Sequence, residues 1–597
     1  MPRPSAPSAT SPAALGVGAA PTPARLAAGT VGDSGSKAAL AKLSIAVEEL
    51  RALKIQPMLH QAVAALNADD AKTGAAWAIK ALEQDERNGF GWYLLAIARE
   101  KAGDFVGSIT CYESALALLP DHAEIANNLG RLAYRLGQKP VAEKLFRHFL
   151  ARFPTDHEGA NNLACVLRDE RRYGEAIDLL KATIGQAPEQ PILWNTLGTT
   201  LAEQGDPANA EIFFDEALRL DPAFAKARYN RGNVRLFQGD PAGALEDCEQ
   251  AMTSPLPADE RLMMRLARST ILLNLGRVGE GWDDYDARLD PSFADVTLVM
   301  VDRPSWTPGA DLAGKKLLIV GEQGLGDEIM FANLLPDLVE ALGPDGHLTL
   351  AVEPRLVALF QRSFPKARVG AHATYLAEGR TYRPLPFLND DALAEIDLWA
   401  PIGGPLRQFR RELAAYPDRP RYLEADPARV AHWREVLATA PAGRKVGLLW
   451  KSGSTLGARH RYYSSFEQWA PVLAAQGVTF VNLQYGDCAA ELDQARRELG
   501  VEIWNPPGVD LKQDLDEVAA LSCALDLVVG FPNATSNIAA ACGAPSWLIS
   551  APASWPRLGT DRLPWYPQMR VFIPERFGEW DPVMARVAEA MGEFGQA

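Results

Sequence analysis

Apolar residues in the first half of the chain recur with a period of 34 residues. One position of the period takes a small residue, in Ser108, Ala142, Ala176, Ala210 and Ala244. Two more take larger apolar residues, in Leu95, Leu129, Leu163 and Leu197 and in Tyr112, Phe146, Leu180 and Phe214. Proline keeps the same step, in Pro120, Pro154, Pro188 and Pro222. Residue classes this different that share one step indicate a repeated structural unit.

A unit of this length is typical of the tetratricopeptide repeat, in which two antiparallel helices touch at a small residue and a proline ends the second helix. Six repeats are expected between Gln56 and Pro257, and a degenerate seventh, LLNLGRVGEGWDDYDARL, follows them. Such arrays stack into a superhelix with a concave groove. The first half of the chain is therefore expected to be a protein-binding arm.

Asparagine recurs near the middle of the first helix of successive repeats, as Asn127-Asn128, Asn161-Asn162, Asn195 and Asn230. Because asparagine is a poor helix former, its repeated use inside helices needs a reason. Amides that face the groove can bind the backbone of an extended peptide, whereas hydrogen bonding between neighbouring repeats is the alternative. We favour peptide binding by Asn128, Asn162, Asn195 and Asn230.

After Pro291 the period ends, and short apolar runs alternate with helical segments. KKLLIV, HLTLAV and IDLWAPI form one group, and KVGLLW, VTFVNLQ, VEIWN, DLVVGF and PSWLIS form a second that begins near Lys445. Strands that alternate with helices predict parallel α/β sheets, and two such units leave a cleft at the carboxyl ends of their strands. A final amphipathic segment, Asp581 to Phe594, is expected to be a closing helix.

These patterns predict an α plus α/β protein with five segments. Residues 1–40 are expected to be a disordered tail, 41–291 the repeat arm and 292–315 a linker. Residues 316–440 and 441–597 are expected to be two Rossmann-like halves, the first on the acceptor side and the second on the nucleotide side.

Composition narrows the partners and the compartment. The formal net charge of −15 argues against nucleic acid or an anionic membrane as the main partner. No apolar run approaches the roughly 18 residues of a membrane span, and the Ala- and Pro-rich start lacks the apolar core of a signal peptide. The six cysteines contain no C-x-x-C pair, which is typical of a reducing compartment. We therefore expect a cytoplasmic protein.

The stretch LLIVGEQGLGDEIMFANLLP, from Leu317, reads as strand, glycine-rich turn and helix, an arrangement that binds phosphates in nucleotide-binding folds. Its glycines, Gly321, Gly324 and Gly326, give G-x-x-G-x-G instead of the dinucleotide pattern, and no G-K-[ST] follows. The turn is therefore neither a dinucleotide fingerprint nor a P-loop.

The run RPSWTPGADLAGKKLLIVGEQGLGDEIMFANLLP resembles bacterial proteins that fuse tetratricopeptide repeats to a two-domain glycosyltransferase of the GT-B fold. VGLLWKSGS, RHRYYSSFEQWAPVL, FVNLQ, LDLVVG and PWYP continue the resemblance. The module is also similar to heptosyltransferases and, in layout, to the eukaryotic O-linked N-acetylglucosamine transferase. Its organisation is most similar to flagellin glycosyltransferases that use activated nonulosonic acids such as pseudaminic acid, where the repeat arm binds flagellin.

The resemblance implies a protein O-glycosyltransferase that moves a sugar from a nucleotide donor, a CMP-linked nonulosonic acid, to Ser or Thr of flagellin or another acceptor. In similar heptosyltransferases the aspartate of the glycine-rich turn is the proposed base. We therefore predict Asp327 as the general base, with Glu328 as the second candidate. The alternative for Asp327 is a carboxylate stabilised by the helix dipole, by about 0.3–1 kcal/mol. Glycines at 324 and 326 let the backbone approach the donor closely.

The second nucleotide-site loop departs from the related proteins. They carry Asp-Thr and, four residues on, His, whereas this chain reads GFPNATSNIAAACGAP with Pro532, Asn533 and Asn537 at those places. Either the donor differs from the common ADP and UDP sugars, or the domain has lost activity. Polar side chains at a helix start favour an anion, so we predict donor binding by Asn533, Thr535, Ser536 and Asn537, with simple helix capping by Asn533 as the alternative.

Basic and amide residues complete the predicted donor site. Lys451 follows a strand and, with Arg459, His460 and Arg461, forms a basic cluster suited to a departing phosphate; a solvated loop is the alternative. Gln484 ends FVNLQ and is predicted to contact the base or the ribose. We expect neither metal nor cofactor beyond the nucleotide-sugar donor, because the pairs Asp284-x-Asp286 and Asp514-x-Asp516 do not follow strands.

Two rival functions stay open on the sequence. A non-catalytic scaffold or chaperone with a degenerate transferase domain fits the altered second loop. A UDP-sugar transferase of the O-linked N-acetylglucosamine type, with the same chemistry, is the second rival. The retained G-L-G-D turn and Lys451 favour a working glycosyltransferase.

Overall fold

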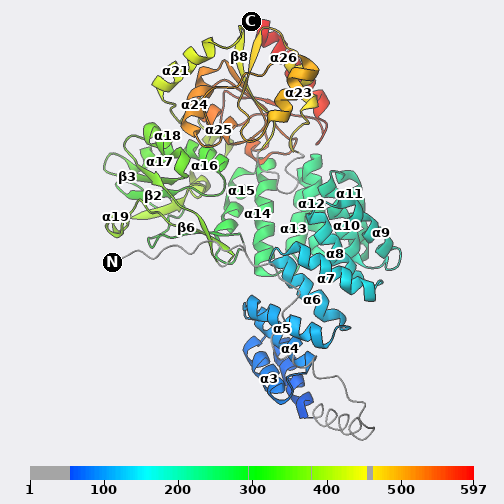
Figure 1. The fold of residues 1–597 in the computed structure, drawn as a ribbon. Helices are drawn as coiled ribbons and strands as arrows, with labels where there is room; N and C mark the ends of the chain where they lie inside the picture. Colours follow the sequence, from blue (N-terminus) through cyan, green and yellow to red (C-terminus); the bar gives the residue numbers. More distant parts are fainter. Residues whose placement is uncertain (1–53, 294, 378, 453–461, 597) are drawn as a thin grey trace. The chain divides into compact units, whose positions relative to one another are not determined.

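The computed structural model describes residues 54–293, 295–377, 379–452 and 462–596. The chain divides into two compact units, Met1–Gln204 and Gly205–Ala597. Helical repeats make up the first unit and begin the second, and three sheets follow in the second unit (Figure 1). In the described residues, no helix is both long enough and apolar enough to cross a lipid bilayer.

Short antiparallel helices build the first unit. After a helix at residues 54–67 these are α3 (Ala71–Gln84), α4 (Gly89–Lys101), α5 (Phe105–Leu118), α6 (Ala123–Arg135), α7 (Lys139–Arg152), α8 (His157–Asp169), α9 (Tyr173–Ile184) and α10 (Pro191–Gln204). Side chains that precede a helix cap several starts: Asn88 accepts from the Gly91 N–H at 2.7 Å and Asp156 from the Gly159 N–H at 2.8 Å. Such caps satisfy N–H groups that have no partner within the helix.

Burial follows the 34-residue period. The small residues Ser108, Ala142 and Ala176 have no exposed surface, and neither do Ala210 and Ala244 in the second unit. Helix pairs approach closely at these positions, because a larger side chain would push the helices apart. The predicted tetratricopeptide array is confirmed.

The second unit opens with α11 (Pro207–Leu220), α12 (Ala225–Gln238), α13 (Pro241–Met252), α14 (Ala258–Asn274) and α15 (Val278–Tyr285). Between α12 and α13 an ion pair occupies two positions that carry apolar residues one period earlier. Arg231 stands one period after Leu197, and Asp247 one period after Phe213. Asp247 is 1% exposed, and its carboxylate accepts from the Arg231 guanidinium at 2.8 Å.

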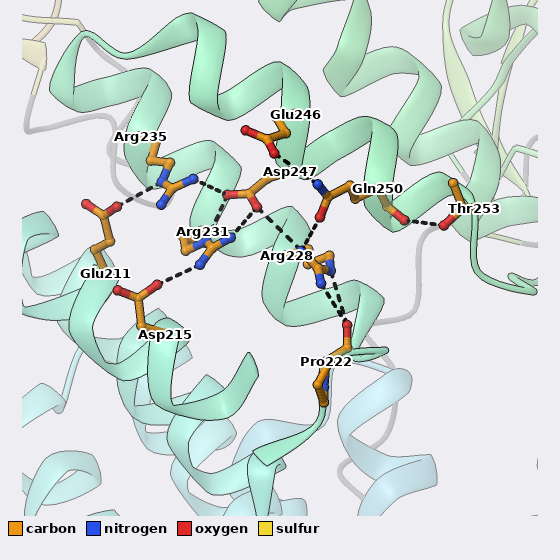
Figure 2. Close-up of polar contacts among 10 residues, drawn as sticks. All are labelled: Glu211, Asp215, Pro222, Arg228, Arg231, Arg235, Glu246, Asp247, Gln250 and Thr253. Carbon is orange, nitrogen blue, oxygen red and sulfur yellow. Dashed lines mark hydrogen bonds and ion pairs between the residues drawn. The ribbon is translucent and has the colours of Figure 1, made fainter. Parts of the chain in front are cut away.

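Further arginines of α12 surround the same carboxylate, as Figure 2 shows. Arg235 Nη1 lies 3.1 Å from Asp247 Oδ2, and Arg235 also binds Glu211 of α11 at 2.8 Å. Hydrogen bonding to Asp247 raises the pKa of Arg231 above the ordinary arginine value. Opposite charges therefore balance inside this network, which ties α11, α12 and α13 together.

Two parallel sheets follow the repeats. The first has the order β4-β3-β2-β7, with β2 (Lys316–Val320), β3 (His347–Val352), β4 (Arg368–Ala371) and β7 (Leu398–Pro401). The second has the order β12-β11-β10-β8-β9, with β8 (Arg444–Leu449), β9 (Val478–Asn482), β10 (Leu527–Gly530), β11 (Ser546–Ile549) and β12 (Arg570–Phe572). Every pairing in both sheets is parallel, as predicted.

Helices accompany both sheets. The helices in the region of the first sheet are α16 (Leu325–Phe331), α17 (Leu335–Leu342), α18 (Val357–Ser363), α19 (Asp390–Ala394) and α20 (Leu406–Phe409). The helices in the region of the second sheet are α21 (Pro427–Ala438), α22 (Ala470–Leu473), α23 (Ala489–Leu499), α24 (Leu515–Ala524), α25 (Ala534–Ala541) and α26 (Trp580–Gln596). The amphipathic C-terminal segment thus forms α26, which contacts α22 and β12.

A third, small sheet was not predicted. It has the order β1-β6-β5, from β1 (Thr297–Val299), β5 (Tyr375–Ala377) and β6 (Arg380–Arg383). Strand β1 lies inside the segment 292–315 that was expected to be a linker, and it pairs in parallel with β6. Conversely, VEIWN makes only an isolated bridge between Trp504 and Val481.

Aromatic side chains join the last repeat to both sheet regions. Trp282 of α15 is 1% exposed. Its ring centroid lies 6.2 Å from that of Phe331 in α16, and 5.9 Å and 6.1 Å from those of Trp555 and Trp565, which follow β11. Edge-to-face aromatic contacts of this kind stabilise beyond the area they bury. The end of the arm therefore shares a core with both sheets.

A buried ion pair lies beside this aromatic cluster. Arg288, in the 3-10 turn after α15, donates through Nε to Glu322 at 2.9 Å and also through Nη2. Glu322 follows β2 and accepts a further bond from the Gly403 N–H at 2.9 Å. Although burial opposes its charge, the field of Glu322 raises the pKa of Arg288. The pair connects the repeat array directly to the glycine-rich turn.

Replacing Asp247 by Leu is expected to destabilise the protein by about 1.5–3 kcal/mol, because Arg231 loses its charged hydrogen bonds to the buried Asp247 and keeps only its pair with the exposed Asp215. The double variant Arg231→Leu/Asp247→Leu recreates the apolar pair of other repeats and should recover most of that loss. Urea unfolding followed by circular dichroism measures both. A double variant as unstable as Asp247→Leu would contradict this account.

Replacing Glu322 by Gln is expected to cost about 3–5 kcal/mol, because Arg288 is left buried without a counter-ion. The matched control is Glu280→Gln, which breaks an exposed Arg–Glu pair on α15 and should cost less than about 1 kcal/mol. Equal urea midpoints for the two variants would show that the buried pair contributes no more to stability than the exposed pair.

Candidate functional site

A cavity of about 940 Å³ lies where the carboxyl ends of the two parallel sheets face each other. The turn after β2, from Gln323 to Asp327, lines one side. Ser452, Tyr485, Asn533 and Ser554, which follow β8, β9, β10 and β11, line the other. The small sheet contributes Thr297, Thr381 and Arg383. Polar and charged groups thus converge in one concave space, as in ligand sites of α/β proteins.

The glycine-rich turn is held from behind by buried carboxylates. Glu322 is bonded to Arg288, as described above, and Glu328 of α16 is 2% exposed. Glu328 accepts from the Glu353 N–H at 2.9 Å and lies 3.0 Å from His372 Nε2. A Cβ at Gly321 would lie 2.3 Å from Cδ of the Glu328 carboxylate, so any other residue here would have to displace that bonded carboxylate. The structure does not bring the Glu328 carboxylate to the cavity.

Asp327 lies in the first turn of α16 and lines the cavity. Its side chain is half-buried, and Oδ2 accepts from the Gly324 N–H at 3.2 Å. The carboxylate therefore caps its helix and faces the ligand space at once. Gly324 and Gly326 line the cavity beside it.

The opposite wall is the start of α25. Asn533 Oδ1 accepts from the Ser536 N–H at 2.9 Å, and Ser536 Oγ accepts from the Asn533 N–H at 2.9 Å. This reciprocal capping uses Ser536, which does not line the cavity. Asn533, Thr535 and Asn537 do line it, and the Asn533 Nδ2 is buried without a hydrogen-bond partner among the described residues.

Asn537 also connects the two sheet regions. Its Nδ2 donates to the carbonyl oxygen of Gly326 at 3.1 Å, and α16 packs on α25. A Cβ on Gly326 would lie 3.1 Å from that same nitrogen, so only a residue without a side chain gives this approach freely. The site is thus closed at its base by a direct contact between its two walls.

The other residues predicted to bind the sugar donor either lie beside the cavity or fall outside the residues that the structure describes. Lys451 is half-buried and paired with Glu491, while its neighbour Ser452 lines the cavity. Gln484 is 1% exposed and accepts from the backbone N–H groups of Trp450 and Lys451 at 3.0 and 2.9 Å. Its amide therefore joins β9 to the end of β8. Arg459 and Arg461, together with His460, lie outside the described residues.

Three basic residues that were not predicted as site residues also line the cavity: Arg355, Arg383 and Lys512. Arg355 is bonded to Glu353 at 2.8 Å, and Lys512 is exposed. Arg383 is 6% exposed, and burial lowers its pKa below the ordinary arginine value. No periodic pattern marks Arg383, because it ends a short strand with no apolar alternation. Within the described ranges, no group of three His, Cys, Asp or Glu residues is placed to hold a metal ion.

The repeat asparagines form bonds between successive repeats. Asn128 Nδ2 donates to Tyr93 Oη at 2.8 Å, and Asn162 Nδ2 donates to Asn127 Oδ1 at 2.8 Å. Asn195 is buried on α10, and Asn230 is half-buried on α12. Bonding between repeats is therefore present in the first unit, and peptide binding by these amides stays a prediction.

Known proteins and solved structures resemble the tetratricopeptide-repeat part of this chain. A tetratricopeptide repeat family profile matches residues 93–157 and 161–225. Protein O-mannosyl-transferase TMTC1 of Mus musculus is 27% identical over 152 residues, which are 25% of this chain and 16% of that protein. A tetratricopeptide repeat protein of Parabacteroides merdae aligns with a TM-score of 0.35 and 16% identity over 39% of this chain and 91% of its own.

Protein FlbA of Caulobacter vibrioides is similar along almost the whole chain. The two proteins are 50% identical over 578 residues, which are 97% of this chain and 96% of FlbA. The chain therefore belongs to the FlbA family.

Proposed function

We propose that this chain is a protein O-glycosyltransferase of the GT-B type. The repeat arm, residues 41–291, recruits an acceptor protein, with flagellin as the first candidate, and residues 292–315 lead into the transferase. The halves 316–440 and 441–597 hold a nucleotide-activated sugar in the cavity between them. The observation that carries this proposal is that one cavity joins the Asp327 carboxylate to the polar start of α25.

Asp327 is the proposed general base. An acceptor hydroxyl of Ser or Thr gives its proton to Asp327 as its oxygen bonds to the anomeric carbon. The bond between that carbon and the donor phosphate breaks, and the nucleotide leaves with the electron pair. Glu328 is assigned a positioning part instead, because its carboxylate is bonded to His372 and to the Glu353 N–H. The hydrogen bond from Gly324 orients the Asp327 carboxylate.

The donor phosphate is assigned to the start of α25. Backbone N–H groups there and the helix dipole favour an anion. The unpartnered Nδ2 of Asn533 and the hydroxyl of Thr535 offer donors to it. Lys451 supports this wall from beside the cavity and must leave Glu491 before it can contact a phosphate. The resemblance to flagellin glycosyltransferases suggests a CMP-linked nonulosonic acid as the donor.

One observation favours a non-catalytic scaffold as the second candidate. Asn537, where related transferases carry histidine, is bonded to the Gly326 carbonyl and joins the two walls. A residue used in this way contributes less to ligand binding. Binding and transfer measurements on the full chain separate the two candidates.

Donor class is tested by titrating the full chain with CMP, UDP and ADP in thermal unfolding and calorimetry. We expect CMP to stabilise most, by about 2.7 kcal/mol at a hundred times its Kd. Thr535→Val should weaken that binding about tenfold, because a hydrogen bond to a charged group is worth about 1.5–3 kcal/mol. The control Thr439→Val, on an exposed helix end, should not change it. Preference for UDP supports the other donor class, and binding of no nucleotide supports the scaffold.

Asp327→Asn is expected to abolish transfer while leaving nucleotide binding intact, because the amide keeps the size of the side chain and cannot take a proton. Loss of a general base lowers rates by about 10²–10⁴. Intact mass of flagellin from cells that carry each variant measures the outcome, with Asp295→Asn, an exposed cavity residue, as the control. A sugar-sized mass retained in Asp327→Asn excludes this residue as the base. A mass unchanged even without the protein supports the scaffold.

A further inference from the structure

One wall of the cavity belongs to the small sheet. Thr297 of β1 is the register partner of Thr381 in β6. Thr381 and Arg383 are two residues apart on one strand, so their side chains share a face. All three line the cavity. This wall therefore offers two hydroxyl groups and a guanidinium to a ligand.

The Arg383 guanidinium is buried with its hydrogen bonding incomplete. Its Nη1 donates to the carbonyl oxygen of Gly321, and its Nε is buried without a partner among the described residues. The two carboxylates whose fields act on it, Glu322 and Glu328, are bonded to other groups. A buried charge with no close counter-charge is costly, so such groups are normally paired or in contact with a ligand.

The other charged residues of the cavity do not supply that counter-charge. Arg355 is bonded to Glu353 and to the carbonyl oxygen of Lys512, each at 2.8 Å. Asp295 is exposed, and Asp327 is bonded to its own helix start. Arg383 is thus a buried cation that lines this wall, and its Nε has no hydrogen-bond partner among the described residues.

The position of Arg383 decides between two kinds of anion. The proposed phosphate site is at α25 on the opposite wall, whereas Arg383 lies behind the turn that carries Asp327, where the sugar and the acceptor meet. A planar guanidinium with hydroxyl neighbours matches the two oxygens of a carboxylate. Resting on the proposed function, we propose that Arg383, with Thr297 and Thr381, binds the carboxylate of an acidic donor sugar and so selects such sugars over neutral ones.

The test measures how much the carboxylate adds to binding. The full chain is titrated calorimetrically with CMP, with CMP-N-acetylneuraminic acid and with the methyl ester of that compound, which lacks the charge. The wild type is expected to bind the acid about tenfold or more tightly than the ester, the factor typical of hydrogen bonds to a charged group. Arg383→Gln should remove this preference and leave CMP binding within about twofold.

Arg355→Gln is the matched control, because it removes a cation from the same cavity that already has a protein partner; it should keep the preference for the acid. Circular dichroism establishes that each variant folds. If Arg383→Gln does not, Arg383→Lys decides, since it keeps the charge without the planar fork and should lose most of the preference.

Each other outcome overturns the assignment in a distinct way. A full preference for the acid in Arg383→Gln or Arg383→Lys shows that another group reads the carboxylate. Equal losses for CMP and for the acid show that Arg383 binds the phosphate. Equal affinity of the wild type for acid and ester removes carboxylate selection but leaves the proposed transferase standing. Failure of the wild type to bind any of the three compounds removes the proposed donor itself.

Discussion

The buried pair of Arg288 and Glu322 is the contact on which the site in the second unit depends. It joins the end of the repeat array to the residue that begins the glycine-rich turn, and the Gly403 N–H completes the coordination of Glu322. Trp282 packs beside it against Phe331 of the helix that carries Asp327. Breaking such a pair leaves a charge in a dry core, so the arrangement has few alternatives of similar free energy. The last repeat is therefore part of the frame that positions the Asp327 carboxylate.

The second constraint is the direct contact between the walls of the cavity. Asn537 holds the Gly326 carbonyl, and the hydroxyl of Tyr422 donates to the carbonyl oxygen of Ile329 at 3.0 Å, so the segment that leads into α21 also fastens α16. With α16 packed on α25, the base of the cavity is closed. The bond to the Gly326 carbonyl needs an N–H donor and no charge, and the Asn537 amide supplies it.

Periodicity decided how much of this could be predicted. The repeats and the strands β2, β3, β8 and β10 could be predicted from the sequence, because each buries a regular set of apolar residues. Strands β1 and β6 could not, since they are short and carry polar residues that only tertiary pairing places. The roles of Arg383 and Arg288 could not be predicted for the same reason, because their partners lie 62 and 34 residues away in the sequence. Gln484 and Lys451 were located at the correct strand ends, but the sequence could not show their bonds to the β8 end and to Glu491, which lie 34 and 40 residues away.

The charges of the cavity follow from the same frame. The chain carries a formal net charge of −15, yet Arg383 holds a buried positive charge behind the turn. The fields of Glu328 and Glu322 favour that charge, and their carboxylates are bonded to His372 and to Arg288. A ligand with a negative group at this wall and another at α25 would satisfy both walls at once, whereas a neutral sugar would leave the guanidinium unpaired. Under the proposed assignment, the cost of an unpaired buried charge is what discriminates against neutral sugars.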